Sequence, residues 1–456
     1  MIRSALLLLS GNAFASALLL ARNLVIARML TVADYGIAST FALALAVIEM
    51  TSAFGLQQQI IQSKDGDDPY FQTVLQGFQL LRGVIAGGAI FLLAGPLARF
   101  LGIPEVTWAY QVLAVVPVLN ALVHFDIHRM NRRMQFGPML WTSSVPALVA
   151  LVVVWPLAWW FGNWQVMLWS IIVQTAMTAI VSHVLAERPW RLALDRNIIA
   201  GSMRFGWPLL ANGMLMFLVF QGDRIIVGRE LGMESLAIFS MGITLTLTPT
   251  LIVAKSATNL FLPKLAAAQR TDLQRLSEQA YEFHLLFAAI LVVACLLLGP
   301  VFVHVALGAK YAALIPMLVW LAILQGLRIF KGGPSTVALA VAQTENAVIA
   351  NIPRIVLLAP AWWIAYRTGE VAPVIALAIL GEMLGVVVAF WLARQRNGLD
   401  LRPLMLPTFL TCATMAAAGL NAWDAAPIAP AWTVGLTIAS CLAAAASMRP
   451  LWQLRR

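Results

Sequence analysis

Long apolar runs separated by short polar segments dominate the chain. One run, Ala147–Trp155, is apolar at every position, so it lacks the alternation that strands of a membrane barrel require. Crossing a bilayer takes about 20 residues of α-helix, and the chain has spans near that length at residues 5–27, 37–57, 79–100, 106–127, 138–160, 166–185, 205–227, 236–260, 283–305, 314–341, 347–366, 371–392, 404–420 and 430–447. The pattern predicts an all-α polytopic membrane protein with about 14 transmembrane helices.

Composition supports this prediction. Of the 456 residues, 61% are hydrophobic and 11% are charged, with a mean hydropathy of +0.85. Soluble domains average about 45–50% apolar and about 25% charged residues, so an ordinary soluble enzyme is excluded. The cysteines (Cys295, Cys412 and Cys441) lie in apolar stretches without C-x-x-C spacing, which argues against a disulfide framework and a cysteine metal site.

The net charge of +10 is explained by where the basic residues fall. With the amino terminus in the cytoplasm, about three quarters of the 30 Lys and Arg residues lie on the cytoplasmic side, as the positive-inside bias requires. We therefore expect a multi-pass protein of the cell inner membrane with both termini cytoplasmic and no nucleic-acid partner. The first span resembles a signal peptide, but its apolar run continues to Ala27, so we expect it to be retained.

A short internal repeat predicts two related halves. Arg22–Leu30 matches Asp223–Leu231 without a gap, and six spans separate the copies, so both halves have the same orientation. We expect parallel, pseudo-symmetric six-helix lobes with a site at their interface near the midplane. The predicted organisation is an N-terminal lobe (1–185), a cytoplasmic linker (186–204), a C-terminal lobe (205–392) and an extra helix pair (393–456).

Two carboxylates lie deep inside apolar spans, Glu49 in the second and Glu382 in the twelfth. An ionised carboxylate at the bilayer centre costs about 2.5–3.5 kcal/mol or more, so each must face a partner or a water-filled cavity, or be protonated. Both are candidates for coupling transport to H⁺ or Na⁺, and we expect no other cofactor. The alternative is a hydrogen bond between helices, especially for Glu382.

Basic residues inside or beside the spans predict an anion-binding cavity between the two halves. The candidate substrate-binding residues are Arg22, Arg28, Asp223, Arg224, Lys255, Arg328 and Lys331. Guanidinium groups bind phosphate and carboxylate bidentately. The alternative is that the arginines near the outer ends of spans reach the membrane surface and pair with nearby acids.

Span 10 combines these cations with Gly332-Gly333-Pro334, which weakens or kinks a helix. Broken helices with charge near mid-membrane mark binding sites in transporters. The span could instead end near Phe330, but Val337–Ala342 resumes the apolar run, so we expect one long span.

His124 and His128 flank Asp126 at helical spacing, but no third ligand lies close in sequence, so we expect no metal site. The adjacent Arg129, Arg132 and Arg133 are expected to meet anionic lipid headgroups on the cytoplasmic face.

Four stretches carry a resemblance to a known family. They are Arg28-Met-Leu-Thr-Val-Ala-Asp34-Tyr35-Gly36; Phe54-Gly55-Leu56 through Ile60-Ile61-Gln62; Arg132-Arg133-Met-Gln-Phe136; and Phe205-Gly-Trp-Pro208 with Gly222-Asp223-Arg224-Ile-Ile-Val-Gly228, Leu231-Gly232, Phe239-Ser240 and Pro263. With them, the chain resembles the Wzx-type polysaccharide and oligosaccharide flippases of the multidrug/oligosaccharidyl-lipid/polysaccharide exporter superfamily. Ala237 replaces a glycine that is usual in that family.

The resemblance implies two six-helix lobes around a central cavity that alternates between inward-open and outward-open states. It also implies an undecaprenyl-diphosphate-linked oligosaccharide as substrate, for O-antigen, capsule or exopolysaccharide synthesis, with a polymerase and glycosyltransferases of the same pathway as further partners. Arg22, Arg28, Asp223 and Arg224 would face the cavity.

Three alternatives stay open at this point. A lipid II flippase of the same superfamily would also suit fourteen spans. A drug/cation antiporter would need a cavity rich in acids, whereas the candidates here are mostly basic. A membrane glycosyltransferase or polymerase is disfavoured by the short external loops.

Overall fold

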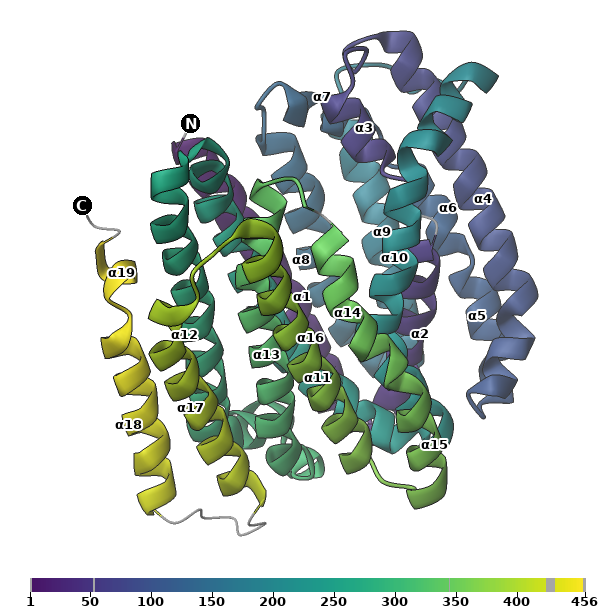
Figure 1. Ribbon diagram of the computed structural model, residues 1–456. Coiled ribbons are helices and arrows are strands. Elements are labelled where there is room, and N and C mark those ends of the chain that lie inside the picture. The colour runs from purple at the N-terminus through teal and green to yellow at the C-terminus, as the bar shows by residue number, and fades with distance from the viewer. Residues whose placement is uncertain (1, 52–53, 344, 424–430, 454–456) are drawn as a thin grey trace. The chain divides into compact units, whose positions relative to one another are not determined.

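The computed structural model describes residues 2–51, 54–343, 345–423 and 431–453, and every regular element in these ranges is a helix (Figure 1). The chain divides into two compact units, Met1–Ala237 and Ile238–Arg456, and each is described by itself. The lobe limits predicted from the repeat remain predictions.

The helices of the first unit follow one another through short loops. They are α1 (Ile2–Met29), α2 (Val32–Thr51), α3 (Leu56–Gln62), α4 (Pro69–Phe100), η1 (Pro104–Val106), α5 (Thr107–Leu113), α6 (Val115–Ala121), α7 (Asp126–Arg132), α8 (Gly137–Phe161), α9 (Gln165–Leu185) and α10 (Arg196–Glu230).

The second unit begins within α11 and ends with a helix pair. Its elements are α11 (Gly232–Ala267), α12 (Arg270–Phe302), η2 (Val303–Leu307), η3 (Ala309–Tyr311), α13 (Leu314–Ala340), α14 (Glu345–Val356), α15 (Leu358–Thr368), α16 (Ala372–Asn397), η4 (Arg402–Leu404), α17 (Met405–Trp423), α18 (Ala431–Ser447) and α19 (Arg449–Trp452).

Within the described residues, each of the fourteen predicted spans overlaps a helix or a run of helices. Residues 52–53 of the second span and residue 430 of the last lie outside the described residues. Among the described residues, eleven helices are long and apolar enough to cross a membrane, or twelve if the bent pair Pro104–Ala121 and Asp126–Arg132 counts as one span. The multi-span, all-helical class is therefore confirmed, but the number fourteen is not. The helix over the last predicted span, α18, has 17 residues, and at 1.5 Å per residue it is shorter than a hydrocarbon core of about 30 Å.

Close glycine contacts set the packing of the first unit. Gly206 and Gly213 of α10 face the backbone of Phe54 and Met50, which a Cβ at either glycine would overlap. Gly36, which ends the Asp34-Tyr35-Gly36 motif, faces the backbone of Met233 in the same way. These positions need glycine because the main chains approach one another directly.

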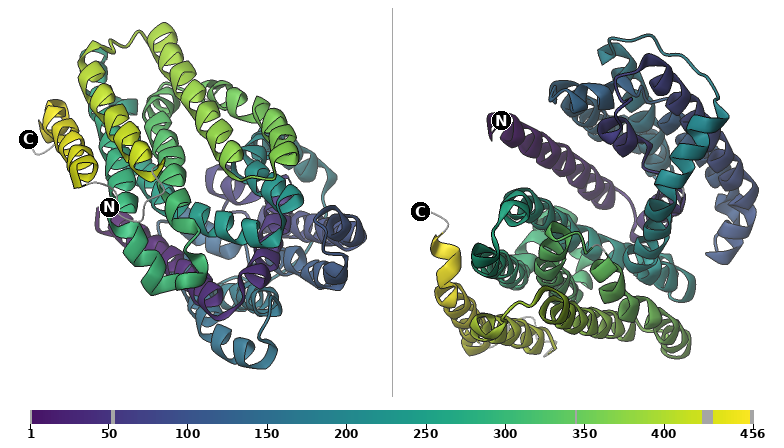
Figure 2. Two further views of the ribbon diagram at one scale, coloured as in Figure 1. Left: turned by 90° about the horizontal axis from the view of Figure 1, so that it is seen from below. Right: turned by 45° about the horizontal axis from the view of Figure 1, so that its top comes forward.

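Helix α13 is the most enclosed of the candidate spans, since 72% of the residues in its 18-residue apolar stretch are buried within the protein. It runs unbroken through Gly332-Gly333-Pro334, so the prediction of one long span is confirmed. A Cβ at Gly332 or Gly333 would overlap His284 or Tyr281 of α12, so these glycines allow α12 and α13 to pack closely. The pair α17 and α18 lies beside α12 at the edge of this unit (Figures 1 and 2).

Candidate functional site

The strongest candidate site is a buried group of charges in the second unit. Glu382 on α16 has no solvent exposure and accepts hydrogen bonds from Arg328 Nε at 2.7 Å and Lys331 Nζ at 2.6 Å, both on α13. The guanidinium of Arg354, on α14 and also fully buried, lies 4.0 Å from the same carboxylate. We call these four residues the Glu382 cluster.

Small residues allow the three helices to meet at this point. Gly381 and Gly385 lie on either side of Glu382 on α16, and a Cβ at these positions would crowd Arg354 and the backbone of Ala350. Asn351 of α14 accepts a second hydrogen bond from Lys331 Nζ, at 2.6 Å. The charged groups are therefore held between helices and not on flexible ends.

The composition of the Glu382 cluster favours anion binding. Three basic side chains share one carboxylate, and Arg328 and Arg354 are the cations that act on Lys331. Like charges in a poorly hydrated site repel strongly, so a further anion near the cluster would be stabilised. Planar guanidiniums match the oxygen spacing of phosphate groups, and an ammonium adds a point charge.

An apolar groove of about 510 Å³ lies on the same helices. Its lining includes Leu327 and Phe330 of α13 and Met383 of α16, each adjacent in sequence to a member of the Glu382 cluster, and extends to Leu404 and Phe409 at the start of the C-terminal helix pair. The members of the Glu382 cluster do not line this groove, but both features lie on α13 and α16. Helices that carry a charged cluster and an apolar groove suit a ligand with an anionic head and a hydrocarbon tail.

The first unit brings together other predicted site residues. Arg22 is 8% exposed and donates hydrogen bonds to Gln174 Oε1 at 2.6 Å and to Asn23 Oδ1 at 3.1 Å. Arg22 and Arg224 both act electrostatically on the buried Tyr35. The structure thus gathers the cations of α1 and α10 around one phenol of α2.

The remaining predicted site residues differ in their surroundings. Asp223 is buried, and Arg28 and Lys255 are exposed. Glu49 is exposed, accepts a 3.5 Å hydrogen bond from Asn120, and is acted on by Arg82. Arg22 reaches Gln174 of α9, so the cation that acts on Glu49 is Arg82.

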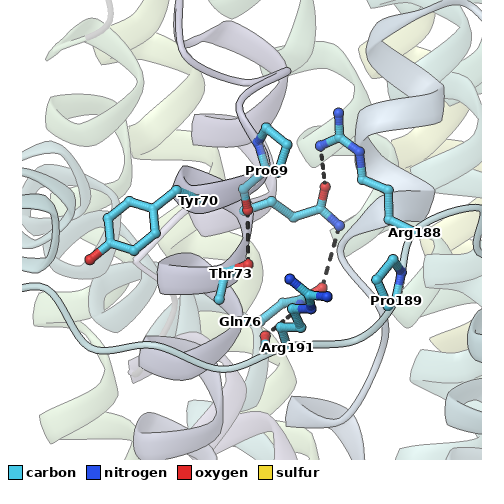
Figure 3. Close-up of a pocket in the computed structure, with 8 residues that line it drawn as sticks. Pro69, Tyr70, Thr73, Gln76, Arg188, Pro189 and Arg191 are labelled. Carbon is cyan, nitrogen blue, oxygen red and sulfur yellow. Dashed lines mark hydrogen bonds between the residues drawn. The ribbon is translucent and has the colours of Figure 1, made fainter.

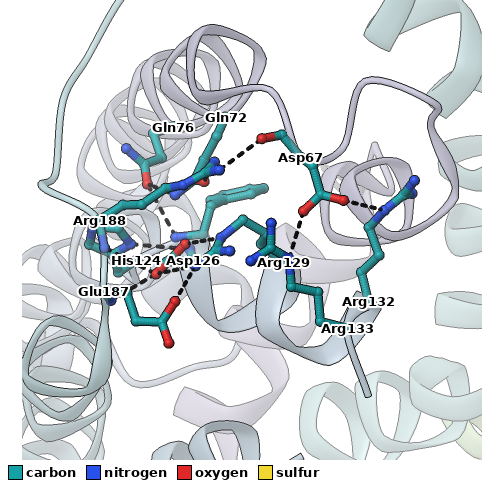
Figure 4. A network of polar contacts seen from close by, with 11 residues as sticks. Asp67, Gln72, Gln76, His124, Asp126, Arg129, Arg132, Arg133, Glu187 and Arg188 are labelled. Carbon is teal, nitrogen blue, oxygen red and sulfur yellow. Dashed lines mark hydrogen bonds and ion pairs between the residues drawn. The ribbon is translucent and has the colours of Figure 1, made fainter. Parts of the chain in front are cut away.

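A second charged group, the linker network, ties α7 to the loop before α4 and to the segment between α9 and α10 (Figure 4). Its members are Asp67, Asp126, Arg129, Arg132, Arg133, Glu187 and Arg188. Arg129 is 2% exposed and pairs with Asp126 and Glu187, while Arg132 donates to the carbonyls of Ile61 and Ser63. Arg129 is therefore committed to internal contacts, and the expectation that it meets lipid headgroups was wrong. For Arg132 and Arg133, whose side chains are 26% and 47% exposed, that expectation stays a prediction.

Backbone amides complete this network. Asp126 accepts hydrogen bonds from the N–H groups of Glu187 and Arg188 at 2.8 and 3.2 Å, so it holds the start of the segment between α9 and α10. Partial burial acts to raise the pKa of the Asp67 carboxyl, but hydrogen bonds and charges of Arg133 and Arg132 outweigh it and hold that pKa below its usual value. In the part of the chain that the structure describes, no three His, Cys, Asp or Glu side chains form a group able to hold a metal ion.

Sequence reasoning missed three polar residues of these sites. Arg354 and Asn351 face the Glu382 cluster from α14, and Gln174 holds Arg22. Arg354 carried a signal, since a cation seven residues into an apolar span needs a partner. Gln174 and Asn351 gave none, because a single amide in a membrane helix is ordinary.

Comparison with solved structures defines the class. The structure is similar to that of the lipid II flippase MurJ in an inward closed conformation, with a TM-score of 0.73, 14% identity and coverage of 99% of this chain and 100% of that one. It is also similar to an inward-facing multidrug resistance MATE family transporter of the MOP superfamily, with a TM-score of 0.65, 15% identity and coverage of 84% and 94%. The chain has the fold of this transporter superfamily.

The profile of the family described as "Polysaccharide biosynthesis protein" matches residues 25–316, and the chain belongs to this family. Relatives include the lipopolysaccharide biosynthesis protein WzxC of Escherichia coli, 23% identical over 74% of this chain and 69% of that protein. The succinoglycan biosynthesis transport protein ExoT of Rhizobium meliloti is 20% identical over 52% of this chain. The amylovoran biosynthesis protein AmsL of Erwinia amylovora is 28% identical over 39%. The chain spans about half the length of the latter two relatives, 48% and 47%.

Proposed function

We propose that the protein is a flippase that moves a lipid-linked oligosaccharide repeat unit, carried on undecaprenyl diphosphate, across the inner membrane. The Glu382 cluster is the observation that carries this proposal, because it offers three cations to one carboxylate in a buried site. Membership of a polysaccharide biosynthesis family supports a glycan cargo, and one relative is named as a transport protein for succinoglycan biosynthesis.

The site accounts for the two parts of such a substrate. The diphosphate binds Arg328, Lys331 and Arg354 in competition with Glu382, while the groove beside Leu327 and Met383 accepts part of the polyprenyl chain. The Arg22 and Arg224 pair around Tyr35 supplies a second cationic position in the first unit. Both termini are cytoplasmic in this proposal, and a polymerase and glycosyltransferases act before and after it.

Transport is coupled to H⁺ or Na⁺ in this proposal, with Glu49 and Glu382 as the coupling carboxylates. Since Glu382 is held by cations, its release when an anionic substrate takes those cations links binding to ion uptake. No chemical step on the substrate is needed, so the protein acts as a transporter and not as an enzyme.

The drug/cation antiporter fits the site less well than a flippase does. A drug/cation antiporter would require a net acidic site, whereas the Glu382 cluster is net basic. A lipid II flippase would bind the same diphosphate, so the Glu382 cluster does not separate it from a flippase for another lipid-linked glycan. The match to a polysaccharide biosynthesis family is what favours the other glycan.

The test is transport by the purified protein in vesicles. Wild-type protein should move a fluorescent polyprenyl-diphosphate oligosaccharide between leaflets, and Arg328→Gln should slow that movement at least about tenfold, because one buried charge contact contributes over about 1.4 kcal/mol. Arg367→Gln, an exposed arginine of α15, is the matched control and should transport normally.

Two outcomes would contradict the proposal. Vesicles with wild-type protein could flip the substrate no faster than empty vesicles, or they could move an organic cation while leaving the lipid in place. The first would remove the flippase assignment, and the second would favour the antiporter.

A further inference from the structure

A pocket of about 440 Å³ lies between the first two turns of α4 and the segment that leads into α10 (Figure 3). Tyr70 and Thr73 line it from α4, and Arg188 and Arg191 line it from the segment. It belongs to the first unit and lies apart from the predicted substrate residues in sequence. Nothing in the transport proposal uses it.

The wall of this pocket is fixed by backbone contacts. Gln76, which is 2% exposed, donates a hydrogen bond to the carbonyl of Arg191 at 2.8 Å, and the N–H of Ala193 donates to the carbonyl of Thr73 at 3.3 Å. Gly77 lies directly against the backbone of Ala193, where a Cβ would overlap it. The segment therefore lies on α4 in one position, and the pocket is preformed.

The two arginines of the pocket differ in their hydrogen bonding. Arg188 donates to Gln72 Oε1 at 2.9 Å and to the carbonyl of Asp67 at 2.8 Å, so it holds the loop before α4. Arg191 is exposed, and among the described residues its guanidinium makes no hydrogen bond or ion pair, since its contact with Gln76 uses only the backbone. An exposed guanidinium that lines a preformed pocket is suited to an external anion.

The neighbouring side chains favour a lipid over a soluble anion. Leu192 and Leu194, which follow Arg191, are 45% and 64% exposed, and Tyr70 is 52% exposed. Leucine, tyrosine and arginine exposed together are typical of the membrane interface, where the apolar parts enter the acyl region and the cation meets headgroups. The nearby carboxylate of Asp195 is engaged by the N–H groups of Asn197 and Ile198 at the start of α10.

We propose that this pocket binds the phosphate of an anionic phospholipid headgroup, with Arg191 as the cation that contacts the phosphate and with Leu192 and Leu194 in the lipid layer. The lipid belongs to the leaflet that the Lys and Arg distribution predicts to be cytoplasmic.

Native mass spectrometry of the delipidated protein tests this proposal with phosphatidylglycerol and phosphatidylcholine as probes. Wild-type protein should bind phosphatidylglycerol more tightly, and Arg191→Gln should reduce that preference about fivefold, the effect of one basic residue near an anionic surface. Arg275→Gln, an exposed arginine of α12 outside the pocket, should keep the full preference. Because the Arg191 side chain makes no hydrogen bond or ion pair within the described part of the protein, its variant should fold normally.

A soluble-anion source is separated in the same experiment. Inorganic phosphate should displace phosphatidylglycerol no better than chloride at equal ionic strength, because the leucines contribute only to lipid binding. Equal binding of the two lipids by the wild type, or an unchanged preference in Arg191→Gln, would overturn the proposal. Displacement by inorganic phosphate together with an unchanged affinity in a Leu192→Ser, Leu194→Ser variant would assign the pocket to a soluble phosphate instead.

Discussion

The linker network and the Glu382 cluster contain the same kinds of charged side chains but differ in what those side chains bind. In the linker network, charged groups bond backbone atoms: Arg132 reaches two carbonyls, Arg188 reaches one, and Asp126 accepts from two N–H groups. In the Glu382 cluster, the contacts run from side chain to side chain between helices.

The balance of charge differs as well. The linker network has four arginines and three carboxylates, whereas three cations share one carboxylate in the Glu382 cluster. A nearly neutral network that closes loops stabilises the fold. A cluster with excess positive charge, held between helices, is left partly uncompensated, and an anionic ligand can neutralise that charge.

The largest expected effect comes from removing the central charge of the linker network. Asp126→Asn leaves Arg129, which is 2% exposed, facing only the exposed Glu187, and breaking a buried pair in this way costs about 3–5 kcal/mol. We expect the folded protein to be largely lost from the membrane, as judged by size-exclusion chromatography and thermal unfolding in detergent.

Glu187→Gln is the control for that experiment. The Glu187 side chain is 57% exposed, so its removal should cost no more than about 1 kcal/mol. If Asp126→Asn were as stable as Glu187→Gln, the linker network would not be structural, and the comparison would fail.

The second prediction concerns the Glu382 cluster, where we expect a substitution to reduce export while leaving stability almost unchanged. Lys331→Met removes one ion pair but also relieves repulsion from Arg328 and Arg354, so stability should change by less than about 1 kcal/mol. Export of polymer should fall at least about tenfold because the substrate loses a cation.

Arg129→Met, in the linker network, is the matched variant. It strips the buried Asp126 of its cation and should unfold the protein. A Lys331→Met variant that destabilises as much as Arg129→Met, or that exports normally, would make the Glu382 cluster another structural element.

Much of this contrast could be predicted from sequence, and the limits have physical causes. Apolar length gave the helices, and the cost of charge in a membrane singled out Glu382, Arg328 and Lys331, since each needed a partner within reach. The presence of Arg354 in the same cluster depends on which helices pack together, and the sequence does not encode that locally.

The linker network was predicted less well for a similar reason. Asp126 and Arg129 are spaced for a helical pair, but the partners that decide their role are the N–H groups of Glu187 and Arg188. Backbone partners of an irregular segment leave no mark in a residue pattern. The arginines were therefore assigned to lipid headgroups by composition alone.

A third, smaller effect is expected at Glu49, which belongs to neither group. Glu49 is exposed and has one long hydrogen bond, from Asn120, so Glu49→Gln should change stability by less than about 0.5 kcal/mol. If the carboxylate couples export to protons, the variant should lose the dependence of export on external pH. Glu370→Gln, another exposed glutamate, should keep it. Export that responds to pH as in the wild type would exclude coupling through Glu49.

The smallest effect is expected at Asp67, on the exposed side of the linker network. Arg133 and Arg132 lower the pKa of its carboxyl despite partial burial, so the ionised form stabilises the fold. This stabilisation is present at pH values above the unfolded-state pKa of about 3.9 and is lost as the pH falls through the lower folded-state value.

Because the side chain is 45% exposed, Asp67→Asn should cost at most about 1 kcal/mol at neutral pH. The difference in melting temperature between wild type and Asp67→Asn should shrink progressively as the pH is lowered below about 3.9, because the wild-type carboxyl loses its charge as the pH falls through its lowered folded-state pKa. Asp65→Asn, in the same loop and also exposed, is the control and should have the melting temperature of the wild type at neutral and at low pH. If the difference in melting temperature between wild type and Asp67→Asn persisted at low pH, the loop would depend on the shape of this side chain and not on its charge.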